Sequence, residues 1–350
     1  MTDRLTKLGE AEWLRLLHKL REVKLLAREH HHHHPDGDRA SRGLDCHPLV
    51  REHFGEKLRQ QNPAAWQEAH SRLYEYYKNL PAKQLPDTLE EMEPLFAAVA
   101  HGCQAGRHQE VLDDVFFERI YRRNEKYSIK QLGAFGADLS ALSNFFEILW
   151  SKPASGLKEN YKGGVLNWAG FALRALGRLR EASQPMQAAI DAAVKQKNWD
   201  DAANGTGTLS ELYLTLGEAD QAVASARQSV DFADRSGDAF QKESKCTTLA
   251  DALHQSGELT EAHQLFREAE AMQQQRQPEY SYLYSLQGFQ FCDLLLSQGQ
   301  YQEVQKRFEK FVEWRLPSDS LLGIALENLS AGRAFLLQAT DRSLAATGQY

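Results

Sequence analysis

A glycine that recurs about every forty residues constrains the fold of this chain more than any other feature. Each of four amphipathic stretches ends at such a glycine, and an acidic or amide residue stands four positions later. The four glycines are Gly177, Gly217, Gly257 and Gly299, at intervals of 40, 40 and 42 residues. A fixed period of this size is typical of a solenoid, in which each unit is one supersecondary structure stacked on the next.

Alignment on these glycines brings residues of the same kind together. Offsets of three and four residues place the apolar positions on one helix face. Small residues at matched points let two helices approach closely, and glycine adopts the left-handed conformation that ends a helix. The aligned sets before the glycine are Ala169, Leu209, Leu249, Phe291; Gly170, Ser210, Ala250, Cys292; and Leu173, Tyr213, Leu253, Leu295. Those after it are Ala182, Ala222, Ala262, Val304; Met186, Ala226, Phe266, Phe308; and Ala189, Ser229, Ala269, Phe311.

The repeated pattern resembles the tetratricopeptide repeat. The clearest copy consists of Leu249, Ala250, Leu253, Gly257, Ala262, Phe266 and Ala269. The period exceeds the ~34 residues of that family, and the proline expected after the second helix is absent, so we expect longer helices or longer loops, as at 235–238. The alternative, a helical bundle with accidental spacing, is disfavoured because four copies agree at seven aligned positions. The resemblance implies a solenoid that binds a protein or peptide in its concave groove.

Composition limits the remaining functions. The chain has 350 residues, 25% of them charged, and a net charge of −7, which argues against general nucleic-acid binding. No run of about 18 apolar residues is present and charges interrupt the N-terminal segment, so we expect no membrane span, no signal peptide and a cytoplasmic location. The four cysteines form no C-x-x-C pair, which excludes the usual zinc-ribbon and redox motifs.

The N-terminal region suggests part of a winged helix. A helix is predicted over Glu10–Leu26, then a polar hairpin whose tip holds His30–His34 and the turn Pro35–Asp38, then a helix over Arg51–Leu58. Five adjacent histidines can bind nickel or zinc adventitiously, but a defined metal site needs ligands from separated positions. We therefore interpret the histidines as a solvated hairpin tip.

A second resemblance begins at Leu44. The segment Leu44–Phe54, Leu-Asp-Cys-His-Pro-Leu-Val-Arg-Glu-His-Phe, is similar to the end of the winged-helix module in bacterial STAND ATPases, the NACHT and NB-ARC relatives. Asp87–Gly102 resembles the start of the repeat array in such proteins. The resemblance implies a sensor and autoinhibitory region. No Gly-x-x-x-x-Gly-Lys-(Ser/Thr) sequence occurs, so the nucleotide-binding domain is expected elsewhere, on another chain or in a longer form of this one.

Together these features predict an all-α fold, a tetratricopeptide-like helical-hairpin solenoid preceded by a partial winged-helix segment. We expect three regions: 1–62, the partial winged helix; 63–150, irregular helices; and 151–350, the repeats of about 40 residues. The segment Ser151–Gly156 is the predicted linker before the repeats, and the last repeat, from Ala331, is predicted to be truncated.

Binding rather than catalysis is the predicted activity. No Gly-x-Ser-x-Gly, His-Glu-x-x-His or dinucleotide fingerprint occurs, so no enzyme activity and no cofactor are expected. Three functions stay open: the sensor of a STAND-type signalling ATPase, a stand-alone scaffold, and, less favoured, DNA binding through the winged helix. The first helix of each pair should line the groove. Its candidate residues are Asn167, Phe171, Arg174, Asn204, Glu211, Thr247, Asp251, His254, Phe289 and Asp293.

Overall fold

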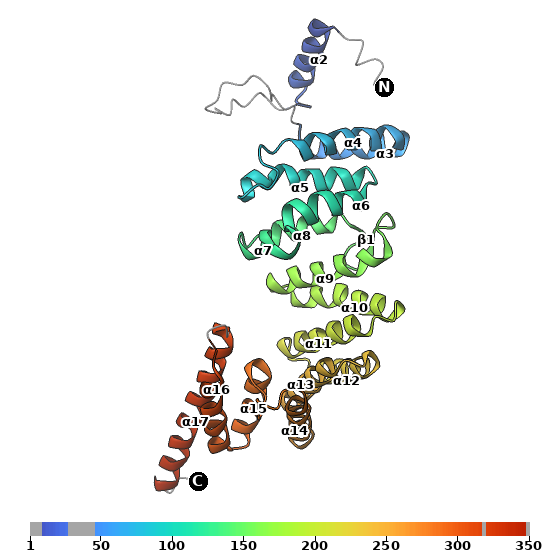
Figure 1. Cartoon of the computed structure of the whole chain (residues 1–350). Helices are drawn as coiled ribbons and strands as arrows, with labels where there is room; N and C mark the ends of the chain where they lie inside the picture. Colours follow the sequence, from blue (N-terminus) through green and yellow to red (C-terminus); the bar gives the residue numbers. More distant parts are fainter. Residues whose placement is uncertain (1–8, 27–45, 317–319, 348–350) are drawn as a thin grey trace. The chain divides into compact units, whose positions relative to one another are not determined.

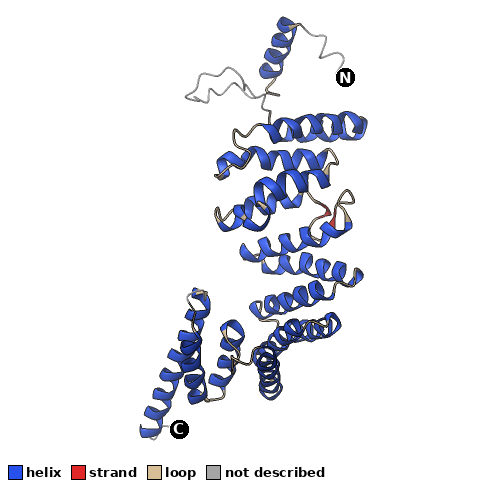
Figure 2. Cartoon of the chain, in the orientation of Figure 1, coloured by secondary structure: helices blue, strands red, loops and turns tan. Residues whose placement is uncertain are grey.

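The computed structural model of the chain describes residues 9–26, 46–316 and 320–347, and these are helical almost throughout (Figure 2). The chain divides into two compact units, one ending at Arg107 and the other beginning at His108. The predicted all-α solenoid of helical hairpins is confirmed, whereas the predicted hairpin over 30–38 lies outside the described residues. The winged helix therefore stays a prediction, as do the region boundaries at 62 and 150.

Helices make up the described part of the first unit. They are α2 (Glu10–Glu22), α3 (Pro48–Gln61), α4 (Pro63–Asn79) and α5 (Leu89–Gln104). Proline stands at the first position of α3 and of α4, where a helix needs no N–H donor. The Asn62 side chain accepts a hydrogen bond from the backbone N–H of Ala65 and so caps α4. The α4–α5 pair buries Tyr74 and Met92 completely.

The second unit begins with short, irregular elements. They are α6 (His108–Glu110), the π-helix η1 (Val111–Tyr121), the 3₁₀-helix η2 (Arg123–Glu125), α7 (Tyr127–Lys130), α8 (Phe135–Ser143), β1 (Phe146–Ile148) and β2 (Lys152–Pro153). The predicted linker Ser151–Gly156 is wrong, because β2 lies inside it and pairs antiparallel with β1. Ala154 is 3% exposed, and its backbone N–H donates to the Phe145 carbonyl. Ser and Gly also favour tight turns, and here Ser151 ends the turn from Ile148 while Gly156 lies in the turn from Ala154 to Leu157.

Paired antiparallel helices follow, as predicted (Figure 1). They are α9 (Glu159–Ala175), α10 (Leu179–Lys195), α11 (Trp199–Thr215), α12 (Ala219–Ser236), α13 (Ala239–Ser256), α14 (Leu259–Arg276), α15 (Ser285–Ser297) and α16 (Tyr301–Trp314). A single long helix, α17 (Leu321–Thr347), comes last. The turn glycines have φ values of 72°, 75°, 92° and 71°. From α9 to α14 each helix has 17 or 18 residues, which explains the 40-residue period.

The aligned small residues lie where two helices touch. Ala182, Ala222, Ala262 and Val304 are completely buried. A Cβ added to Gly170 would lie 2.8 Å from the Met186 Cγ, so that pair needs a glycine for its close approach. One aligned position departs from the pattern, because Phe308 on α16 is partly exposed and its neighbour Arg307 is completely buried instead.

Candidate binding groove on the first helices

The first helices of successive pairs lie beside one another. Helix α13 contacts α11 and α15, and α15 contacts α17. An ion pair links α9 to α11, since Arg174 Nη2 lies 3.8 Å from Glu211 Oε2. This row of helices carries all ten predicted groove residues, and eight of them belong to a hollow or to a series of polar contacts.

The hollow lies between α9 and α11 and has a volume of about 220 Å³. Four predicted residues line it: Asn167, Phe171, Arg174 and Asn204. The Phe171 side chain is 52% exposed, although exposed phenylalanines are costly unless something covers them. Met186 from α10 also lines it. Asp201 lines it too, so an apolar ring, a cation, a carboxylate and two carboxamides face one cavity, which suits a peptide with mixed chemistry.

The polar chain continues from α13 to α17. Gln290 Nε2 on α15 donates to Asp251 Oδ2 on α13 at 3.1 Å. His254 Nε2 lies 3.2 Å from Ser297 Oγ, and His254 Nδ1 lies 3.8 Å from Asp293 Oδ2. We give the name groove ladder to a set of polar side chains that fall into three contact groups, with charge interactions between them: Arg174, Glu211, Lys245, Asp251, His254, Gln290, Asp293 and Arg333. Its last link is the 2.6 Å ion pair between Arg333 Nη1 and Asp293 Oδ1.

Burial shifts the protonation equilibria of the groove ladder. It raises the pKa of Asp251 to about 6, against the hydrogen bond from Gln290 and with the support of the nearby Asp293 and Glu211 charges. Burial also raises the pKa of Glu211, although Arg174 and Lys245 oppose this shift. It lowers the pKa of Lys245, opposed by Glu211, and the pKa of His254. Carboxylates and amines that are partly dehydrated in a cleft are typical of functional sites.

Sequence reasoning missed three members of the groove ladder: Lys245, Gln290 and Arg333. Lys245 is 9% exposed, and its Cδ and Nζ would each lie 3.4 Å from a Cβ added to Gly207 on α11. A glycine at a groove position opposite a lysine is a signal that could have indicated this contact. Gln290 and Arg333 carried no such signal, because their partners stand about 40 residues away in the sequence.

Two predicted residues take no part in the hollow or in the groove ladder. Thr247 is only 2% exposed, and its hydroxyl donates to the Ser244 carbonyl, so it does not line an accessible surface. The physical reason is that α13 packs between α11 and α15, which encloses this side of the helix. Phe289 lies partly exposed on α15.

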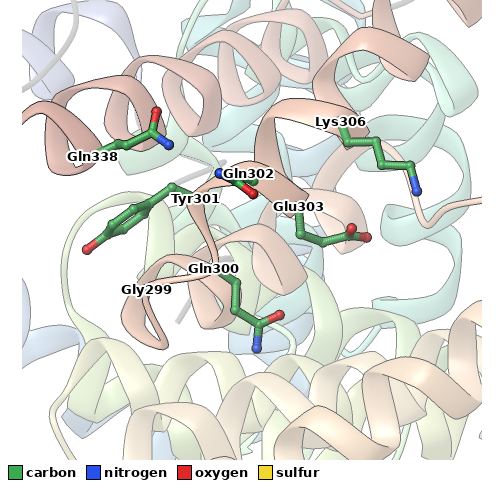
Figure 3. A pocket seen from close by; sticks show the side chains of 7 residues that line it. All are labelled: Gly299, Gln300, Tyr301, Gln302, Glu303, Lys306 and Gln338. Carbon is green, nitrogen blue, oxygen red and sulfur yellow. The ribbon is translucent and has the colours of Figure 1, made fainter.

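A larger hollow of about 550 Å³ lies at the start of α16, away from every predicted residue. Figure 3 shows its polar lining, which includes Gln300 just before α16, Glu303 and Lys306 from α16, and Gln338 from α17. Tyr301 also lines it, and the Tyr301 hydroxyl donates to Asp341 at 2.8 Å. Because this lining lacks an apolar wall to exclude water, it is a weaker candidate for a binding site.

Other kinds of site find no support in the described residues. Within 9–26, 46–316 and 320–347, no three His, Cys, Asp or Glu side chains are grouped so that they could hold a metal ion. Cys246 and Cys292 are buried, and burial raises their pKa values to about 11 and about 12, so they act as small apolar residues. The His30–His34 run lies outside the described residues. In the same described part, none of the helices combines the length and apolarity needed to cross a bilayer.

Comparisons with known proteins are consistent with this geometry without adding to it. No protein-family profile matches the sequence, and no curated protein is detectably similar. Solved structures that match include the tetratricopeptide-like repeats of a Podosopora anserina protein described as a kinesin light chain, at 14% identity and a TM-score of 0.38. That match covers 66% of this chain and 96% of the other.

Two further solved structures are similar at the same level. BtubC from P. vanneervenii is 13% identical, with a TM-score of 0.38 over 81% of this chain and 91% of its own. A STAND protein with a tetratricopeptide repeat sensor from Pyrococcus horikoshii is 12% identical, with a TM-score of 0.33 over 95% of this chain and 59% of its own. The fold assignment rests on the helix pairs and their buried contacts, since these scores are low.

Proposed function

We propose that this chain binds a protein segment along its first helices. The observation that carries the proposal is the groove ladder, a row of partly dehydrated polar and charged side chains on the first helices from α9 to α17. The groove ladder contains three cations and three carboxylates, so its net charge is zero and it does not attract nucleic acid. The individual charges still select ligands whose own charges are complementary. Burial raises the pKa values of Asp251 and Glu211, and a basic group of a ligand would stabilise their charged forms.

The hollow suggests how a peptide is held. Asn167 and Asn204 each offer an amide donor and acceptor for an extended peptide backbone. Arg174 suits a carboxylate, and the exposed ring of Phe171 suits an apolar side chain. Further along, Asp251 suits a lysine or arginine of the ligand. The favoured ligand is therefore a peptide with an apolar residue followed by a basic one.

A peptide-display selection against the full chain tests this proposal. Selected peptides should bind with affinities that Arg174→Ala and Asn204→Ala each weaken about tenfold, the usual cost of a lost interface anchor. The matched control is Arg180→Ala on α10, whose side chain is 78% exposed and paired with Glu218. Peptides whose affinity depends on Arg180 but not on Arg174 would place the binding surface outside the groove.

We further propose that the bound segment is a trigger for a signalling ATPase of the STAND type. The support is the segment that ends at Phe54, of which His47 caps α3 and Pro48 begins it. In this role, binding in the groove would shift the protein between closed and open states, and the described helices α2 and α3 would relay the shift to a nucleotide-binding domain. The alternative is a scaffold in the cytoplasm that joins protein partners without an ATPase.

The DNA that flanks the coding sequence separates these two roles. An upstream in-frame extension that encodes Gly-x-x-x-x-Gly-Lys-(Ser/Thr) would support the sensor. An in-frame stop close upstream of Met1 would support the scaffold. DNA binding through the N-terminal region, the least favoured function, would be removed by the absence of DNA affinity at low salt.

A further inference from the structure

The last helix, α17, takes the place of the first helix in a fifth pair. It packs against α15 and α16 (Figure 1). Arg333 contacts Asp293 on α15, and Gln338 accepts a hydrogen bond from Gln305 on α16. One repeat length of 40 residues separates Arg333 from Asp293, so the register of the earlier pairs continues into α17.

The other side of α17 is apolar and exposed. Leu322, Leu329 and Leu336 are 69%, 51% and 67% exposed and lie seven residues apart. Three small residues, also seven apart, alternate with them. These six residues fall within about 100° of the helix circumference, at 100° per residue. We call Leu322, Ala325, Leu329, Gly332, Leu336 and Ala339 the α17 stripe.

In the earlier pairs this face is covered by the second helix. Gly332 stands 40 residues after Cys292, in the column that also holds Gly170 and Ala250. The other members of that column are buried, whereas a Cβ added to Gly332 would meet no atom within 4 Å. The α17 stripe therefore keeps the small residue that permits close helix contact, although no helix among the described residues covers it.

The covering helix does not follow by the turn used elsewhere. Ala339 occupies the position one repeat length after the turn glycine Gly299, and α17 continues through it to Thr347. As a result α17 has 27 residues, against 13 in α15. Because α17 continues past the turn position, a second helix like those that cover this face in the earlier pairs does not begin there.

We propose that the partner is α17 of a second copy, packed antiparallel. With the two-fold axis between residues 330 and 331, every leucine of the α17 stripe faces a small residue of the other helix. Leu329 then faces Gly332 of the partner subunit, Leu322 faces Ala339 of the partner subunit, and Leu336 faces Ala325 of the partner subunit. Such alternation gives a self-complementary, isologous contact in which large residues fill the spaces beside small ones.

Charge and length agree with this arrangement. The α17 stripe contains no ionisable residue, and the nearby Arg333 and Asp341 already bond to Asp293 and Tyr301. From Leu322 to Ala339 the stripe extends about 26 Å, at 1.5 Å per residue. A contact between two helices over several turns has this length. Such a contact would remove the whole stripe of exposed leucines from water.

Sedimentation equilibrium of the full chain between about 1 and 100 µM tests the proposal. The wild-type chain should be dimeric, and Leu329→Glu should raise the dissociation constant at least tenfold because it places a charge opposite Gly332 of the partner subunit. The control is Leu149→Glu, since Leu149 is also 51% exposed but lies between β1 and β2. Matching circular dichroism melts establish that both variants fold.

Disulfide trapping tests the antiparallel register. In a Cys46→Ser background, Leu329→Cys should cross-link to its own copy, since the two cysteines are offset by about 4.5 Å along the axis, within reach of a disulfide. Leu322→Cys should not, because its offset is about 26 Å. Equal cross-linking at both positions would indicate parallel helices and overturn the register. A monomer at 100 µM, or a dimer unaffected by Leu329→Glu, would overturn the proposal and leave the α17 stripe to a helix of another segment or protein.

Discussion

The three pairs from α9 to α14 and the fourth pair, α15–α16, share a turn glycine but not the same kind of core. In the first three pairs, apolar and small residues at fixed positions form most of the contacts between helices, and an ion pair of a buried carboxylate, Glu243 with Arg276, leaves the arginine 33% exposed. Where the fourth pair meets the third, both charges of an ion pair are buried: Arg307 Nη1 and Nη2 on α16 donate to the two oxygens of Glu270 on α14 at 2.7 and 3.1 Å. Arg307 is 0% exposed.

The aligned columns show how unusual this pair is. Glu270 stands where the earlier units have Ile190 and Val230, and Arg307 stands where they have Ser225 and Leu265. The link between α14 and α15, residues 277–284, is longer than the others and brings Tyr282 over the guanidinium, 4.3 Å from the ring centroid. The Leu283 backbone N–H donates to Glu270 as well. Hydrogen bonds and an ion pair to Glu270 thus hold the longer link in place, and we call these contacts the polar anchor. The short turns of the other pairs are held by close packing.

The largest expected effect tests that anchor. Arg307→Ala should lower the free energy of unfolding by about 3–5 kcal/mol, because it leaves the buried Glu270 carboxylate without its main counter-charge. Urea unfolding followed by circular dichroism measures the loss, and faster hydrogen exchange of the Leu283 amide would locate it. The matched double variant, Arg307→Met with Glu270→Gln, should recover more than half of the lost stability. A double variant as unstable as Arg307→Ala would mean that packing, not charge, explains the effect.

The second prediction tests the regular pairs. Ala262 is 0% exposed at the contact between α13 and α14, so Ala262→Arg should cost about 3 kcal/mol through overpacking and a buried charge. Gln264→Arg, two residues further on the exposed side of α14, is the control and should change stability little. An Ala262→Arg protein with the melting temperature of the wild type would contradict the repeat register.

The third prediction concerns Asp251 in the groove ladder. Burial raises its pKa from 3.8 to about 6, so the folded chain binds this proton more tightly than the unfolded chain. The carboxyl is therefore most stabilising below pH 3.8, and its contribution is lost as the pH rises through 6. At pH 7.5 Asp251→Asn should stabilise the chain by about 1–2 kcal/mol, since Gln290 can still donate to the amide oxygen.

Melting curves at two pH values measure this difference. The gain from Asp251→Asn should be clear at pH 7.5 and small at pH 4.5. The same variant should weaken the binding of selected peptides that carry a basic residue, because the ionised carboxylate is the group proposed to bind that residue. Equal stability of variant and wild type at both pH values would mean that Asp251 is better solvated than its contacts suggest.

The regular pairs were predictable from the sequence because their physics is local. Glycine at a helix end and small residues at spacings of three and four determine turns and close contacts within one unit. The same alignment placed Arg174, Glu211, Asp251 and Asp293 on the first helices. The alignment could not predict the hydrogen bonds and ion pairs that these side chains form. Each of those contacts joins residues about 40 positions apart and depends on how successive helices cross.

The buried ion pair and the β1–β2 turn were not predictable for the same reason. Arg307 and Glu270 interrupt columns that are otherwise apolar or small, and an isolated charge in such a column normally indicates an exposed position. Its burial depends on Tyr282 and Phe291, whose rings lie within 4.4 Å of the guanidinium. Likewise the packing of Ala154 depends on Phe145, and nothing in the composition of 151–156 requires it.

The smallest expected effect concerns an arginine–glutamate ion pair like that of Arg307 and Glu270, but an exposed one. Arg227 on α12 and Glu261 on α14 also join successive second helices, at 2.9 Å, but their side chains are 51% and 45% exposed. Arg227→Ala should cost less than about 1 kcal/mol, since water screens the pair in either state, and added salt should reduce even that loss. Urea unfolding at low and high salt measures both. A cost that approaches that of Arg307→Ala would show that the link between second helices matters more than its burial, and the distinction between the two kinds of core would then be wrong.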